Sequence, residues 1–166
     1  MHDLPNSREG ERRPGGPLAW YLIRTKQHKE RVCCQRLTSL VEDVYLPLLR
    51  ASGRQRFVAR QPLFPCYLFA RFKLKERLYR IMHTPGVAGI VPSADEPCEV
   101  NAGIVDYFRT REKDGVIVLN LETFRLQPNL TIIWGDFREV DRLFERYLSG
   151  PERTLLLMDS IGTVRT

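Results

Sequence analysis

The sequence predicts an α+β fold, in which helices pack on a mostly antiparallel sheet and a small β unit follows. Two observations support this class. Short runs of aromatic and aliphatic residues favour strands, and they alternate with amphipathic stretches whose apolar residues recur at helical spacing. In chain order these segments give a strand, a helix, three strands, a helix, a strand and a helix, before a set of short strand-like runs.

Residues 1–17 are expected to form a disordered tail, because they are rich in Gly, Pro, Arg and Glu and contain no aromatic residue. Such a segment buries too little apolar area to offset the entropy of ordering it. Folding is expected to begin at Leu18, with a strand at Trp20–Arg24. Thr25 is expected to cap a helix over Gln27–Leu40 with an apolar stripe of Cys33, Leu37 and Leu40.

A basic hairpin is predicted next. Val44–Leu49 forms one strand, with Pro47 suggesting an edge position, and Arg54–Arg60 returns after a turn at Ser52 and Gly53. Its arginines surround an aromatic ring and suit a phosphate backbone with one stacked base. The alternative is an exposed hairpin that its charges keep soluble, and the sequence leaves both open. The hairpin residues concerned are Arg50, Arg54, Arg56, Phe57 and Arg60.

The central strand is predicted within Gln61–Phe72, a proline-rich opening followed by seven residues without Gly, Pro or acid. Because side chains alternate along a strand, one face carries Cys66, Leu68, Ala70 and Phe72 and the other carries Tyr67, Phe69 and Arg71. Two interpretations remain for the second face. It either meets another macromolecule, or the strand is buried on both faces with Arg71 at its end.

A helix is predicted over Leu74–Met82, and it ends where His83-Thr84-Pro85-Gly86 breaks the hydrogen-bond ladder. His83 has no second histidine or carboxylate at ligand spacing, so a structural or exposed role is expected. A strand follows at Val87–Val91, and Asn101 is expected to cap a helix that runs through Glu112.

Charge and composition divide the chain. Residues 18–112 hold 16 basic and 9 acidic residues, which indicates a polyanionic partner such as nucleic acid. Asp114-Gly115 marks a plausible boundary, so the predicted units are a domain at 18–112, a linker at 113–123 and a C-terminal domain at 124–166. The latter contains strand-like runs at 130–134, 153–158 and 163–165, and a stretch at 138–148 that suits either an amphipathic helix or two strands.

Several classes of protein are not expected. No apolar stretch approaches the roughly 20 residues of a membrane span, and the polar N-terminus has no signal peptide. The four cysteines, which have no CxxC spacing, are expected to be buried in a reducing cytoplasm: they are Cys33, Cys34, Cys66 and Cys98. No nucleotide-binding loop, paired carboxylates or nucleophilic triad is recognisable, so neither an enzyme nor a cofactor or metal site is predicted.

Four segments together resemble the NusG family of transcription elongation factors: WYLIRTKQHKERV, PLFPCYLFARF, HTPGVAGIV and WGDF followed by RTLLLMDSIG. The resemblance spans roughly residues 19–166. It implies an N-terminal NGN domain joined to a KOW-type, SH3-like β-barrel. It also implies a cytoplasmic, monomeric transcription factor that promotes processive elongation or antitermination, not an enzyme.

The resemblance further implies which residues meet which partners. The clamp helices of the largest RNA polymerase subunit would bind Tyr67 and Phe69, joined by Ile104 and Phe108, while a second surface holds the opposite lobe. Upstream or non-template DNA would be contacted by Lys26, Lys29, Arg36, Arg54 and Arg56. Alanine at both Tyr67 and Phe69 would then abolish polymerase binding and leave stability nearly unchanged. Rho or a small-subunit ribosomal protein is the partner implied for the C-terminal domain.

Departures from the family pattern indicate a specialised, RfaH-like paralogue. Arg24 stands where RfaH has a tyrosine, and Gln127-Pro128-Asn129 and Gly135-Asp136-Phe137 replace KOW consensus positions. RfaH has a C-terminal domain that is either a helical hairpin over the clamp site or a β-barrel, and this chain has the same two options. The β-barrel is favoured because RTLLLM is rich in branched aliphatic residues. An RNA-binding or ribosome-associated KOW protein is the alternative function.

Overall fold

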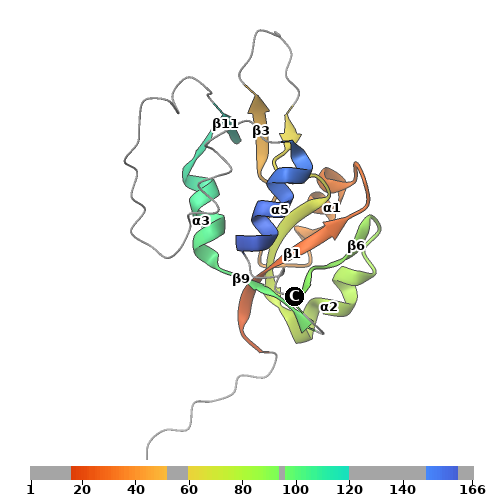
Figure 1. The fold of residues 1–166 in the computed structure, drawn as a ribbon. Coiled ribbons are helices and arrows are strands. Elements are labelled where there is room, and N and C mark those ends of the chain that lie inside the picture. Colours follow the sequence, from red (N-terminus) through yellow and green to blue (C-terminus); the bar gives the residue numbers. More distant parts are fainter. Residues whose placement is uncertain (1–15, 52–59, 94–95, 120–148, 161–166) are drawn as a thin grey trace, which may run out of the picture.

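The computed structural model describes residues 16–51, 60–93, 96–119 and 149–160, and it forms a mixed α+β domain (Figure 1). Its main sheet is antiparallel throughout, with the strand order β2-β5-β1-β6 and with β9 also paired to β1. The strands are β1 (Leu18–Thr25), β2 (Asp43–Tyr45), β5 (Tyr67–Lys73), β6 (Val87–Ile90) and β9 (Glu99–Val100).

The pairing of β1 with β5 sets the two faces of this sheet. Leu22 lies opposite Phe69, and Ile23 lies opposite Leu68. Because neighbours along a strand point to opposite faces, Leu22 and Phe69 enter one hydrophobic cluster while Ile23 and Leu68 enter another. The central strand β5 is therefore buried on both faces, and Arg71 near its end is exposed.

Each face of the sheet is covered by two helices (Figure 1). The helices α1 (Glu30–Leu37) and α2 (Leu74–Met82) contribute Cys33, Leu37 and Ile81 to one cluster. The helices α3 (Ala102–Thr110) and α5 (Gly150–Ser160) contribute to the other. We call these two sides the α1/α2 face and the α3/α5 face.

Two smaller sheets complete the described structure. One has the order β10-β11-β3-β4, with β11 parallel to β3, and the other is the hairpin of β7 and β8. The strands are β3 (Leu48–Ala51), β4 (Gln61–Pro62), β7 (Pro92–Ser93), β8 (Glu96–Pro97), β10 (Glu112–Lys113) and β11 (Val116–Leu119).

The first part of the predicted linker at 113–123 is a β-hairpin rather than a connector. Asp114 and Gly115 join β10 to β11, and both have positive φ, at 53° and 71°. A two-residue turn of this kind matches the twist of antiparallel strands, and Asp-Gly is among its preferred sequences. The sequence pair that suggested a boundary is therefore a hairpin turn.

Two helix predictions are confirmed. The helix α2 has the predicted bounds, and Asn101 caps α3 because its side-chain oxygen accepts a hydrogen bond from the Gly103 N–H at 2.8 Å. The helix α3 ends at Thr110, two residues before the predicted end.

The start of α1 was predicted wrongly. The helix begins at Glu30, and Thr25 belongs to β1, where its buried hydroxyl has no hydrogen-bond partner among the described residues. The intervening residues form a turn, in which His28 has φ 58° and the Lys26 N–H donates to the Gly86 carbonyl at 2.8 Å. This contact with a distant segment fixes residue 26 outside the helix, although the local sequence pattern is helical.

Two further predictions need correction. The strand expected at Val44–Leu49 is divided between β2 and β3, which lie in different sheets, with Pro47 between them. Of the four cysteines, Cys33 is buried and the other three are half-buried. Burial raises the pKa of all four thiols, so they stay protonated at neutral pH.

The run 153–158, expected to be a strand, lies inside α5. The sequence SGPE explains the difference. The Ser149 N–H donates to Glu152 Oε2 at 2.7 Å, and the Glu152 N–H approaches Ser149 Oγ at 3.5 Å, which together form a capping box. The predictions for residues 1–15, for the strands at 130–134 and 163–165, and for 138–148 lie outside the described residues, as does most of the proposed β-barrel.

Stability is expected to fall with alkaline pH through Tyr21. Burial, with the nearby Glu99 carboxylate, raises the pKa of Tyr21 to about 12 from 10.0. Between these values the unfolded chain has lost this proton and the folded chain keeps it, so the free energy of unfolding decreases as pH rises. Urea unfolding of Tyr21→Phe should show a shallower decrease than wild type over this range, and parallel curves would contradict the assignment.

Candidate functional site

The four side chains expected to bind a protein partner meet on the α3/α5 face. Phe69 comes from β5, and Ile104 and Phe108 come from α3; all three belong to one cluster, and Tyr67 packs against it. Phe69 and Phe108 have no exposed surface, Ile104 is 3% exposed, and Tyr67 is half-buried. The sequence therefore identified residues that lie together, but this structure closes most of them off from solvent.

Aromatic rings form the centre of this cluster. The Phe69 ring centroid lies 6.2 Å from those of Phe64 and Phe108, and Phe64 and Phe108 are 5.4 Å apart. Edge-on and tilted arrangements at these distances are favourable beyond the burial of area alone. Phe69 is thus part of the folding core, and truncation of it to alanine is expected to cost about 3–5 kcal/mol. The expectation that Phe69 can be removed with little effect on stability is therefore wrong.

The helix α5 closes the α3/α5 face. Leu157 is fully buried in the same cluster and Met158 packs against it. The helix is also fixed by a polar contact, because Arg153 Nε donates a hydrogen bond to the Leu63 carbonyl at 2.7 Å. At its first turn Gly150 meets Pro65 so closely that a Cβ on Gly150 would lie 2.6 Å from Pro65 Cγ.

The side chains of α5 that are described as buried lie close together on the helix. Of its side chains that the structure describes, Arg153 and Leu157 are buried, one turn apart, whereas Leu155 between them is 62% exposed. Burying one leucine contributes about 2 kcal/mol. A helix of 11 residues is marginal in water without tertiary contacts. Among the side chains of α5 that the structure describes, Arg153, Leu157 and Met158 attach this cover to the face.

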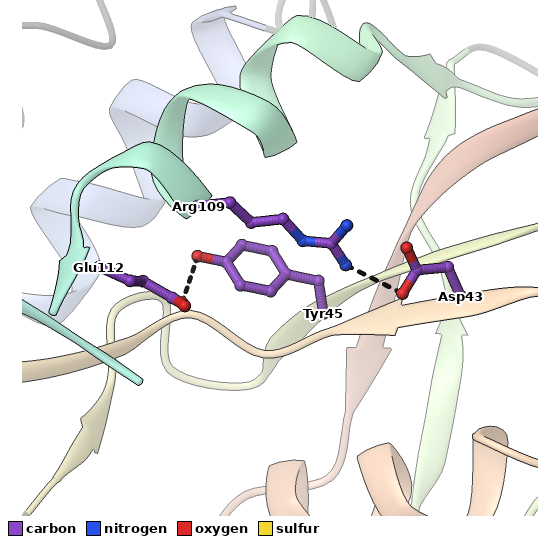
Figure 2. A network of polar contacts seen from close by, with 4 residues as sticks. All are labelled: Asp43, Tyr45, Arg109 and Glu112. Atoms are coloured by element: carbon purple, nitrogen blue, oxygen red, sulfur yellow. Dashed lines mark hydrogen bonds and ion pairs between the residues drawn. The ribbon is translucent and has the colours of Figure 1, made fainter. Parts of the chain in front are cut away.

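A polar frame joins the end of α3 to the edge of the sheet (Figure 2). Arg109 forms an ion pair with Asp43 at 2.9 Å, and its guanidinium carbon lies 5.0 Å from the Tyr45 ring centroid and 5.3 Å from that of Trp20. The Tyr45 hydroxyl donates to Glu112 at 2.7 Å. Burial, followed by the Glu112 contact, raises the pKa of Tyr45, and the hydrogen bond to Asp43 raises that of Arg109. Both groups keep their protons at neutral pH.

Three of the predicted nucleic-acid residues lie on the α1/α2 face. Lys26, Lys29 and Arg36 are exposed, and all three border the turn that follows α2. Arg36 Nη1 donates to the Pro85 carbonyl at 2.7 Å, and a Cβ at Gly86 would lie 3.4 Å from that of Lys29. Arg54 and Arg56 lie outside the described residues.

Sequence reasoning missed the residues that hold α5. Leu63 and Phe64 belong to the PLFP motif, which located the strand and contributed to the family resemblance but was not interpreted as part of the core. Both side chains are fully buried in the cluster on the α3/α5 face. Ser149 and Glu152 form the capping box described above. A serine three residues before a glutamate, next to an apolar run, is a helix-start signal that could have identified α5.

Some alternative sites find no support within the described ranges. No group of three or more His, Cys, Asp or Glu side chains there lies close enough to hold a metal ion. In the same ranges, no helix has the length and apolar character needed to cross a membrane.

The described domain corresponds to a known protein family. Residues 18–109 match the family described as "Transcription termination factor nusG". Twenty-one chains of solved structures also match, among them one titled "Domain interaction in Thermotoga maritima NusG". That structure is 22% identical, covers 54% of this chain and has a TM-score of 0.43. This chain in turn spans 54% of it, about half its length. No curated protein matches.

The match covers more than half of the chain, and it contains both central strands, the three helices of the domain before α5, and the residues of the α3/α5 face up to Arg109. The antiparallel sheet with helices on both faces fits the N-terminal domain of that family. Its members are transcription factors and not enzymes. The chain belongs to the NusG family.

Proposed function

We propose that this protein binds RNA polymerase through the α3/α5 face and acts as a transcription elongation or antitermination factor. The observation that supports this most strongly is the position of α5. The apolar surface that the family resemblance assigns to the polymerase clamp is the surface that α5 covers, and Leu157 is buried in it.

The first step of the mechanism is displacement of α5. Among the described residues, Leu157, Met158 and Arg153 contact this face. A partner that offers a larger apolar area, and a hydrogen-bond donor for the Leu63 carbonyl, would replace these contacts at small net cost. The family resemblance assigns this role to the clamp helices of the largest polymerase subunit. Tyr67, which is half-buried at the margin of the face, would become the first ring to be covered.

The second step depends on the rigidity of the face after α5 leaves. The Arg109–Asp43 ion pair joins α3 to β2, and the Tyr45–Glu112 hydrogen bond joins β2 to β10, which follows α3 (Figure 2). None of these four residues belongs to α5. Ile104 and Phe108 would then keep their positions and present a preformed surface. A preformed surface binds more tightly because less conformational freedom is lost on association.

Bridging would follow from a second contact. With one face on the clamp, the domain would reach the opposite lobe of the polymerase and oppose its opening, which favours processive elongation. The exposed cations Lys26, Lys29 and Arg36 lie on the other side of the sheet, where they would meet upstream or non-template DNA. Covering of the α3/α5 face by a C-terminal helix is the arrangement proposed for an RfaH-like paralogue. A KOW-type domain beyond residue 119, and its binding of Rho or of a ribosomal protein, belong to the same proposal.

Weakening the α5 cover should strengthen polymerase binding. Leu157→Ser removes the buried apolar contact, worth about 2 kcal/mol, and it should raise the affinity of the full chain for core RNA polymerase roughly tenfold or more. The measurement is biolayer interferometry with immobilised polymerase. The matched control is Leu155→Ser, on the same helix and 62% exposed, which should leave affinity unchanged. Equal effects of the two substitutions, or weaker binding by Leu157→Ser, would contradict masking by α5.

Tyr67 should contribute to polymerase binding but little to the stability of the fold. Because its side chain is half-buried, Tyr67→Ala is expected to weaken polymerase binding by roughly tenfold and to shift the urea midpoint much less than Phe69→Ala does. Both variants are best made in the Leu157→Ser background, where the face is open. Co-purification from cells provides the independent check, since recovery of ribosomes instead of polymerase subunits would favour the KOW alternative.

A further inference from the structure

A tight turn just before β5 places a cysteine in an unfavourable backbone conformation. The Tyr67 N–H donates to the Phe64 carbonyl at 3.1 Å, which closes a turn over residues 64–67. Pro65 is the second residue of this turn, and Cys66, the third, has φ 68°. This pattern is that of a type II turn, whose third residue is ordinarily Gly or Asn. Because other side chains are unfavourable at positive φ, contacts from outside the turn must stabilise it.

Glu30 provides such a contact. It is the first residue of α1 and is 7% exposed, and its Oε1 accepts a hydrogen bond from the Cys66 N–H at 2.8 Å. In a type I turn, the peptide unit between the second and third residues is turned over relative to type II. The Cys66 N–H would then point away from Glu30. The hydrogen bond to Glu30 therefore stabilises the type II form over the type I form.

Two further hydrogen bonds attach the same segment to the region around α1. The Thr25 N–H, at the end of β1, donates to the Cys66 carbonyl at 2.8 Å. Arg31, the second residue of α1, donates from Nη2 to the Arg60 carbonyl at 2.9 Å. The helix α1 thus contacts both ends of the segment 60–66, and it does so at the end of the sheet where β1 stops and β5 starts.

The same turn also contributes to the α3/α5 face. Phe64 is fully buried in the cluster of that face, and Pro65 is the residue against which Gly150 of α5 packs. Tyr67, the proposed polymerase contact, directly follows Cys66. A change from type II to type I would reorient the peptide that joins Pro65 to Cys66. We therefore expect it to shift both the proline ring beneath α5 and the Tyr67 side chain.

We propose that Glu30 is a positioning residue, which keeps the turn at 64–67 in the type II form and thereby sets the position of α5 and of Tyr67. Its influence passes from the α1/α2 face to the α3/α5 face around the end of the sheet, through the backbone of Pro65 and Cys66. The effect on α5 follows from the contacts described above. The effect on polymerase binding through Tyr67 rests on the proposed function.

NMR of the full-length protein tests the turn directly. In a type II turn Pro65 Hα points towards the Cys66 amide proton and in a type I turn it does not, so the NOE between them is strong only in type II. Glu30→Gln keeps an oxygen acceptor and should keep a strong NOE, whereas Glu30→Ala should weaken it. Both substitutions remove the same charge, so a difference between them reports the hydrogen bond. Glu76→Ala on α2 is the matched control, because it removes an exposed carboxylate paired with Lys73 and should leave the NOE strong.

A second substitution separates positioning from general stabilisation. Glycine adopts positive φ without steric cost, so Cys66→Gly should restore the type II form, and with it a strong NOE, in the Glu30→Ala background. Amide hydrogen exchange reports the effect on α5. Glu30→Ala should accelerate exchange at residues 150–158 roughly tenfold more than at residues 74–82, and adding Cys66→Gly should reverse most of this difference. If Glu30→Ala does not fold, recovery of a folded protein by Cys66→Gly is the equivalent rescue.

Three results would overturn the proposal. They are a wild-type NOE in Glu30→Ala, equal acceleration of exchange in α2 and α5, which loss of global stability alone would produce, and no rescue by Cys66→Gly.

Polymerase binding, measured in the Leu157→Ser background, is a separate test. Weaker binding by Glu30→Ala and recovery by Cys66→Gly would support the whole proposal. An altered turn with unchanged affinity would support the role of Glu30 in the turn and contradict the polymerase contact of Tyr67, so the two failures are distinguishable.

Discussion

The pairing of β1 with β5 is the constraint on which the rest of this structure depends. It places Leu22 and Phe69 on one side of the sheet and Ile23 and Leu68 on the other. Because side chains alternate strictly, a shift of register by one residue would exchange the two sets. Both sets are buried under helices, so the register is specified from both sides at once. This register therefore decides which residues of β1 and β5 lie on the α3/α5 face and which lie on the α1/α2 face.

One consequence is a separation of chemistry by the sheet. The α3/α5 face is aromatic and aliphatic, with a polar frame at its edge around Arg109. The α1/α2 face buries a smaller cluster and carries a dense array of cations on its outer surface. Under the proposed function, a protein partner on one face and a nucleic acid on the other would contact different residues.

The sequence was sufficient to predict the elements whose structure is determined by local signals. The helix at Leu74–Met82 follows from its apolar spacing and from the Pro-Gly turn after it, and Asn101 caps its helix through a contact two residues away. The sequence was insufficient to predict features that depend on contacts between segments far apart in the chain. The Lys26 N–H donates to the Gly86 carbonyl, and the helix α1 begins only at Glu30. Burial of β5 on both faces was one of the two interpretations of its residue pattern and is confirmed, but that pattern does not identify α3 and α5 as the elements that enclose Phe69. In RTLLLM the strand preference of the aliphatic residues competed with a helix-start signal at Ser149, and the latter prevailed.

The close contact between Gly150 and Pro65 makes the position of α5 sensitive to substitution at Gly150. Any side chain at Gly150 would place its first carbon 2.6 Å from a proline ring that cannot swing away. The first turn of α5 would then have to lift, although no residue of the face beneath had changed. A single substitution outside the proposed binding surface would thus disturb the seating of α5 without changing any residue of that surface.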